Sequence, residues 1–168
     1  MITPEQFVEK YLPFAKQTEE KTGINHLALM AQAALESGWG SKAVGNMMFG
    51  IKATKDTPED KRQLITTTEW LSVPNAKFPE VISVEHHPDG KYKYLVKDWF
   101  RKYDSPEESF TDHANFIKNN PRYSEALKVK SDPNRFVEEL AKAGYATDPH
   151  YGETLKSMIV SIKKRLPK

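Results

Sequence analysis

The stretch AQAALESGWG, residues 31–40, decides the fold: a run of small apolar residues ends on Glu36 and then breaks into Gly38-Trp39-Gly40. The run belongs to a helix that Asn25 can cap, and a helix that is apolar on all sides is normally buried. A carboxylate at the C-terminal end of a helix lies near the negative pole of the backbone dipole. Burial of the helix removes water from the carboxyl group, and the dipole repels its negative charge. Both effects disfavour the ionised form, so the sequence predicts a raised pKa for Glu36.

A carboxylic acid that stays protonated near neutral pH is what a glycosidase needs to protonate a leaving-group oxygen. Trp39 can supply an apolar wall beside this acid, or a surface on which a sugar ring stacks. Tyr145, which follows Gly144 in a turn, is a second aromatic residue placed to reach a cleft. The alternative is that Glu36 is an ordinary solvated residue at a helix end.

The rest of the chain predicts helices on both sides of a short β-rich region. Thr3-Pro4-Glu5 is typical of a helix start, and Thr22-Gly23 ends that helix. The run LITTTEWL, residues 64–71, is β-branched and aromatic, and two further strand signals flank a turn at Pro88-Asp89-Gly90. Helices are expected again near residues 106–119, 121–129, 133–143 and 149–165. We therefore expect one mainly helical α+β domain over residues 1–168, with a β-lobe at about 62–100.

Hydrolysis of a glycosidic bond by the usual two-carboxylate scheme requires a second acidic residue. Glu69 is the best candidate, because strand alternation places it on the same face as Ile65 and Leu71. The alternative reading of Glu69 is a surface position on an edge strand, opposite a lysine. Spacing alone leaves four competitors for the second role: Glu80, Glu85, Asp98 and Asp112.

Composition and motifs argue against most other classes of protein. The 168 residues carry 25 Lys and Arg against 23 Asp and Glu, and this net charge of +2 gives no strong overall field to attract nucleic acid; the basic tip Lys163-Lys164-Arg165 is typical of a solvated helix end. No apolar run reaches the length that spans a bilayer. Cysteine, a His-Glu-x-x-His pair and Gly-x-Ser-x-Gly are all missing from the sequence, which disfavours thiol, zinc and serine chemistry. We expect no metal, no cofactor, no nucleic-acid partner and no membrane insertion.

Six segments of the chain form a specific combination: ALMAQAALESGWG, NMMFGIKA, ITTTEW, FRKYDSPEESFTDHANFI, NPRY and AGYATDPHYGETLKSMI. Together they closely resemble the glucosaminidase domain of glycoside hydrolase family 73. The similarity extends from about residue 10 to 165 and is especially high to the peptidoglycan-hydrolase half of the flagellar rod-assembly protein.

The resemblance implies a lysozyme-like helical lobe and a small antiparallel β-lobe around a glycan cleft. It implies an endo-β-N-acetylglucosaminidase that cleaves the β-1,4 bond between N-acetylglucosamine and N-acetylmuramic acid in peptidoglycan glycan strands. By this resemblance the catalytic acid falls on Glu36, the second glutamate on Glu69 and the motif tyrosine on Tyr145. The residues expected to bind the glycan or support the site are Trp39, Phe49, Tyr103 and Asp112, and we expect Asp112 to perform no chemistry.

The chain also departs from the family pattern. The segment Leu71–Lys91 is longer than expected, so it is predicted to reshape the cleft or bind a partner. Residues 1–6, MITPEQ, lack the features of a secretory signal. We therefore expect action in the bacterial periplasm or cell wall after export by a dedicated secretion system or release by lysis. That setting suits a phage-type lysin, or an antibacterial effector with a cognate immunity protein as its inhibitor.

Two other functions remain open at the level of sequence. A lytic transglycosylase shares a Glu-Ser at a helix end and needs only one catalytic carboxylate. An inactive glycan-binding or assembly module would retain the fold without turning over peptidoglycan.

Overall fold

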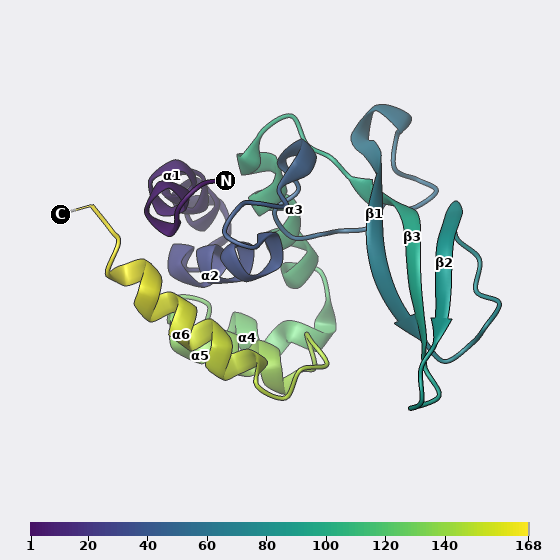
Figure 1. Ribbon diagram of the computed structural model, residues 1–168. Coiled ribbons are helices and arrows are strands. Elements are labelled where there is room, and N and C mark those ends of the chain that lie inside the picture. Colours follow the sequence, from purple (N-terminus) through teal and green to yellow (C-terminus); the bar gives the residue numbers. More distant parts are fainter. Residues whose placement is uncertain (168) are drawn as a thin grey trace. The chain divides into compact units, whose positions relative to one another are not determined.

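A computed structural model describes residues 1–167. The chain divides into two compact units (Figure 1): a helical unit, Met1–Phe49 together with the chain from Tyr103 onward, and a sheet unit, Gly50–Lys102. The sheet unit is therefore inserted between two parts of the helical unit. The predicted class, mainly α with a small antiparallel β-lobe, is confirmed.

The helical unit is built around one buried helix, α2 (His26–Ser37). α2 packs against α1 (Pro4–Thr22) and against α5 (Pro133–Lys142) and α6 (Tyr151–Lys163), while α3 (Pro106–Lys118) packs on α1 (Figure 1). Residues 27–34 of α2 are all buried. The helix that the sequence predicted to be apolar on all sides is therefore the centre of this core.

Strong local signals place both ends of α1 and α2 at the predicted residues. Thr3 caps α1, and Gly23 ends it in the left-handed conformation at φ 79°. Asn25 caps α2 by accepting a hydrogen bond from the Leu27 N–H, and Gly38 ends it at φ 58°.

The later helices differ from prediction in two places. The helix expected over 121–129 is a single-turn helix, η3 (Pro121–Tyr123), followed by the short α4 (Ser124–Leu127). α6 begins at Tyr151, later than the predicted residue 149, because the Asp148 side chain accepts a hydrogen bond from the His150 N–H and holds a turn there. No helix within residues 1–167 is both long enough and apolar enough to cross a membrane.

The sheet unit holds three antiparallel strands, β1 (Arg62–Leu71), β2 (Glu80–His86) and β3 (Tyr92–Arg101), after the single-turn helix η2 (Glu59–Lys61). β3 lies in the middle, in the order β1-β3-β2. The predicted alternation along β1 is confirmed: Ile65, Thr67, Glu69 and Leu71 lie on the half-buried face, and the residues between them are exposed.

The segment Leu71–Lys91 supplies the loop after β1, the edge strand β2 and the turn into β3. The side chains of β2 are all exposed. The hydroxyl of Tyr94 on β3 donates to the carbonyl of Val73 and accepts from the N–H of Ala76, which fastens the loop to the central strand. The predicted turn at 88–90 is confirmed, with Gly90 in the left-handed region at φ 85°.

Candidate active site

Glu36 occupies the last turn of α2, where the backbone reverses sharply. Gly38, Trp39 and Gly40 all have positive φ, at 58°, 55° and 88°. The hydroxyl of Ser37 braces this turn, because it donates to the Ala33 carbonyl at 2.6 Å and accepts from the Gly40 N–H at 2.9 Å. The Gly-Trp-Gly break is therefore a braced left-handed turn that fixes the end of the helix carrying the acid.

Glu36 is accessible to solvent, yet neighbouring protein atoms displace part of the water around its carboxyl group. The residue is exposed at the surface of the helical unit, and within residues 1–167 its carboxyl group makes no hydrogen bond or ion pair. Protein atoms still displace enough water for burial to raise the pKa of Glu36. The predicted direction of the shift is confirmed, and no charged group among the described residues opposes it.

Tyr145 lies within electrostatic reach of Glu36, in the loop between α5 and α6. Its ring stacks on Tyr151 at a centroid distance of 5.5 Å and meets the edge of His113 at 6.1 Å. Burial raises the pKa of Tyr145 well above its usual range, and the charges of Tyr151 and Glu36 act in the same direction. Tyr145 is therefore a neutral hydroxyl beside the candidate acid.

The turn that presents Tyr145 is clamped by Arg122 of the NPRY segment. The Arg122 guanidinium donates to the carbonyl of Ala143 at 2.6 Å and to the carbonyl of Gly144 at 2.9 Å. Gly144 has φ +78°, and a Cβ there would lie 2.6 Å from an Arg122 nitrogen. The NPRY and AGYATDP segments are thus held together by the Arg122 side chain.

A buried polar chain lies beside Glu36, and sequence reasoning missed it. His113 Nε2 is 2.8 Å from Gln32 Oε1, and Gln32 Nε2 donates to the Tyr151 hydroxyl at 3.0 Å. These three residues are 0–4% exposed. Phe49 is also buried and stacks flat on the His113 ring, at 3.9 Å between centroids. Phe49 therefore supports His113 and does not face solvent.

The other predicted glycan-binding residues of the helical unit are half-buried. The Trp39 ring packs edge-on against Phe7 of α1, at a centroid distance of 5.4 Å. The Tyr103 hydroxyl donates to Asp112 Oδ2 at 2.6 Å, and the Tyr103 carbonyl accepts from the Asn46 side chain at 2.9 Å. Tyr103 thus joins the loop at residue 46 to Asp112 in the middle of α3.

Glu69 lies in the sheet unit, on the half-buried face of β1. Lys52 Nζ lies 3.0 Å from Glu69 Oε1 and 3.3 Å from Asp98 Oδ2. Burial opposes the charge on Lys52, but the hydrogen bonds that its ammonium donates to Glu69 and Asp98, together with their negative charges, outweigh burial and raise the pKa of Lys52. One ammonium group therefore bridges the candidate second carboxylate and one of its competitors.

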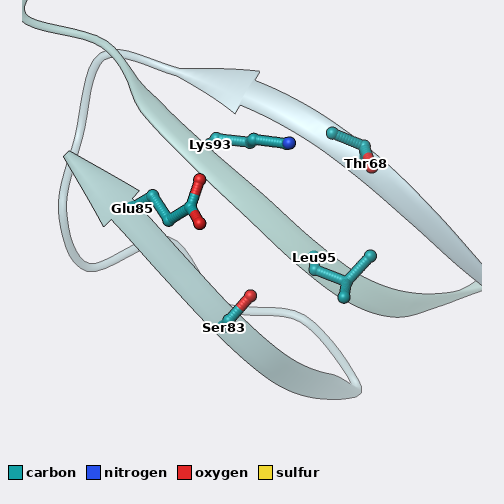
Figure 2. A pocket seen from close by; sticks show the side chains of 5 residues that line it. All are labelled: Thr68, Ser83, Glu85, Lys93 and Leu95. Atoms are coloured by element: carbon teal, nitrogen blue, oxygen red, sulfur yellow. The ribbon is translucent and has the colours of Figure 1, made fainter. Parts of the chain in front are cut away.

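Two other competitors lie on the opposite face of the sheet. Glu80 is paired with Lys97, and Glu85 lines a shallow pocket on the exposed face (Figure 2). The other residues of this pocket are Thr68, Ser83, Lys93 and Leu95. Because Thr68 and Glu69 are neighbours on β1, their side chains point to opposite faces. Glu80 and Glu85 therefore do not share a face with Glu69.

Comparison with known sequences decides the family. The sequence pattern of the Glucosaminidase family, described as mannosyl-glycoprotein endo-beta-N-acetylglucosaminidase, matches residues 12–164. The chain belongs to the glucosaminidase family. The predicted family is thereby confirmed.

Relatives of this glucosaminidase-family chain span a range of similarity. The peptidoglycan hydrolase FlgJ of Vibrio parahaemolyticus is 33% identical over 98% of this chain and 48% of its own length. A probable N-acetylmuramidase of Lactococcus lactis is 29% identical over 92% of this chain and 33% of its own length. The chain thus spans about half the length of the first of these relatives and a third of the second.

A solved glucosaminidase-family structure covers nearly the same extent as this chain. The C-terminally truncated glycoside hydrolase domain of Salmonella typhimurium FlgJ has a TM-score of 0.72 at 31% identity, over 96% of this chain and 99% of that domain. The fold described above is therefore that of a glycoside hydrolase domain of this family.

Proposed function

We propose that the chain is a peptidoglycan endo-β-N-acetylglucosaminidase that hydrolyses the β-1,4 bond between N-acetylglucosamine and N-acetylmuramic acid. The observation that carries the proposal is the state of Glu36: it lies at the surface, its carboxyl group has no ionic partner within residues 1–167, and the surrounding protein atoms raise its pKa by desolvation. The family match supports a glucosaminidase, and the name of the Vibrio relative supports peptidoglycan as the substrate.

In this proposal each residue has a distinct role. Glu36 protonates the leaving glycosidic oxygen. Glu69 acts as the base toward water or stabilises the oxocarbenium-like transition state. Tyr145 orients the N-acetyl group at the cleaved bond. Trp39 and Tyr103 bind sugar rings, Asp112 holds the Tyr103 hydroxyl, and Phe49 supports His113.

The test is digestion of purified peptidoglycan by the wild type, Glu36→Gln and Glu69→Gln, with the products reduced and identified by mass spectrometry. Reducing N-acetylglucosamine ends are expected. Glu36→Gln is expected to lose activity almost completely, and Glu69→Gln by about a hundredfold or more, since both remove a positioned acid–base group. Glu9→Gln, an exposed carboxylate on α1, is the matched control. Full activity of Glu36→Gln overturns the proposal.

The same products separate the alternatives. The Lactococcus relative is named a muramidase, and reducing N-acetylmuramic ends would assign that bond to this chain instead. Anhydro-muramic ends would identify a lytic transglycosylase, and an intact sacculus would identify a binding module. A Glu69→Gln variant that stays active while Glu80→Gln or Glu85→Gln does not would move the second role to the opposite sheet face.

The biological setting belongs to the proposal as well. An antibacterial enzyme of this kind acts in the periplasm or cell wall, and an effector requires an immunity protein that blocks it. Expressing the chain in a bacterium with and without an added export signal tests this setting. Lysis only of the exporting cells is the expected result, and equal growth of both cultures would contradict it.

A further inference from the structure

We propose that His113, Gln32 and Tyr151 form a buried positioning relay that directs the Tyr151 hydroxyl proton toward the carboxyl group of Glu36. Three elements contribute to it: α3 supplies His113, α2 supplies Gln32 and the start of α6 supplies Tyr151. The inference rests on the proposed role of Glu36 as the acid and adds the residues that set its strength.

The direction of the relay follows from the histidine. Burial lowers the pKa of His113 to about 3, so the ring is neutral and carries a single N–H. Its Nε2 faces the Gln32 carbonyl oxygen, which only accepts, so the proton sits on Nε2. The Gln32 amide is then turned with its NH₂ group toward Tyr151.

This arrangement makes the Tyr151 hydroxyl an acceptor from Gln32. Its own proton is consequently directed away from Gln32, and within residues 1–167 it has no acceptor. Gln32 and Glu36 are four residues apart on α2, so Glu36 lies one turn further along the same helix face. We assign the carboxyl group of Glu36, whose charge acts on Tyr151, as the acceptor that this proton meets.

Titratable groups around Tyr151 support this geometry. The charges of Glu36 on α2 and of Tyr123 in η3 act on Tyr151, the ring of Tyr145 stacks on it, and His113 is linked to it through Gln32. Glu36 is the carboxylate among these groups, and in this proposal it accepts the Tyr151 proton once the acid ionises, a hydrogen bond that the structure with its unpaired carboxyl group does not yet contain. A donor that stabilises the carboxylate makes Glu36 a stronger acid.

The first experiment reads the relay without any turnover. Protein labelled with ¹⁵N at histidine is examined by NMR for the tautomer of His113 at neutral pH. Protonated Nε2 and unprotonated Nδ1 are expected. With the opposite tautomer, the Gln32 amide would be reversed and its carbonyl oxygen would accept a hydrogen bond from the Tyr151 hydroxyl. That result would overturn the proposal.

The second experiment follows kcat/KM against pH in Tyr151→Phe and Gln32→Met. Loss of the donor leaves Glu36 a weaker acid, so the alkaline limb of the profile is expected to move upward by about half a pH unit or more. The rate at the optimum is expected to fall about tenfold. The double variant is expected to be no worse than Tyr151→Phe alone, since both residues act in one chain.

Controls separate the possible failures. Tyr11→Phe removes a hydroxyl from another buried tyrosine, in α1, and its alkaline limb is expected to stay in place. An unmoved limb in Tyr151→Phe, with Glu36→Gln inactive, rejects the relay and leaves the proposed function standing. An active Glu36→Gln rejects the proposed function itself. If Gln32→Met does not fold, Tyr151→Phe and the tautomer of His113 still decide the matter.

Discussion

Arg122 and Gly144 are in direct contact across the turn that presents Tyr145. The guanidinium donates to the Gly144 carbonyl at 2.9 Å, and its terminal nitrogen occupies the space that a Cβ at Gly144 would need. This contact fixes the backbone immediately before Tyr145. Because Tyr145 is proposed to orient the substrate, the contact links a surface arginine to activity.

Replacement of Arg122 is therefore expected to lower activity through Tyr145. Arg122→Ala removes both hydrogen bonds to the turn, and we expect kcat/KM to fall between about tenfold and a hundredfold, since small misplacement of a positioning group has large effects. Arg122→Lys is expected to recover only part of the loss. An ammonium group can donate to one of the carbonyls, but it lacks the planar fork that reaches both. Arg135→Ala, an exposed arginine on α5, is the control; equal activity of Arg122→Ala and Arg135→Ala would contradict the clamp.

Gly144→Ala is expected to destabilise the protein by more than a change of conformation alone explains. An L-residue at φ +78° costs about 1–2 kcal/mol, and the new methyl group also collides with Arg122. Gly90→Ala is the matched control, because Gly90 has φ +85° with no atom within 4 Å of its Cβ position. Thermal unfolding of both variants isolates the collision. An equal loss in the two would show that Arg122 moves aside freely.

His113 is expected to make stability depend on pH. The folded state holds this ring neutral down to a pKa of about 3, whereas in the unfolded chain it binds a proton below about 6.5. The unfolded state therefore binds more protons between these values, and stability falls as the pH is lowered from about 6.5 to about 3.

The slope of that loss can be measured directly. Urea unfolding between pH 7 and pH 4.5 is expected to show a contribution approaching 1.4 kcal/mol per pH unit that is missing from His113→Phe. The Phe variant is less stable at pH 7, because it leaves the Gln32 carbonyl without its donor. His150→Gln removes an exposed histidine and should retain the wild-type slope. Parallel slopes for the wild type and His113→Phe would contradict the prediction.

Lys52→Met is expected to lower kcat/KM clearly while it changes the free energy of unfolding only slightly. The lysine side chain is half-exposed, so its ion pairs with Glu69 and Asp98 contribute on the order of 1 kcal/mol or less. Without it two carboxylates share the half-buried face of the sheet with no counter-charge, and we expect kcat/KM to fall about tenfold as Glu69 loses its position. Lys97→Met, which removes the partner of Glu80 on the opposite face, is the control. Identical activity in the two variants would remove Lys52 from the site.

The parts of the structure that the sequence predicted are those set by neighbouring residues. Asn25 and Gly38 mark the ends of α2, so the position of Glu36 at a helix terminus could be read directly. Alternation along residues 65–71 likewise placed Glu69 on the half-buried face. Both signals act within a few residues, where helix and strand periods apply.

The parts that could not be predicted depend on residues distant in the chain. Gln32 meets Tyr151 and His113 across separations of 119 and 81 residues. A lone glutamine in an apolar helix was the available signal, because a buried amide must find partners. His113 and Tyr151 lie inside segments quoted for the family resemblance, but no local pattern assigned them a role.

The chain leaves and re-enters the helical unit at two points that are hydrogen-bonded to each other. The Tyr103 N–H donates to the Gly45 carbonyl, and the Asn46 side chain donates to the Tyr103 carbonyl, so the exit and the return are fastened to each other within the helical unit. The sheet unit is inserted between these two points, which hydrogen bonds hold together. A change in the length of the segment between these two points is therefore expected to leave the helices around Glu36 in their arrangement.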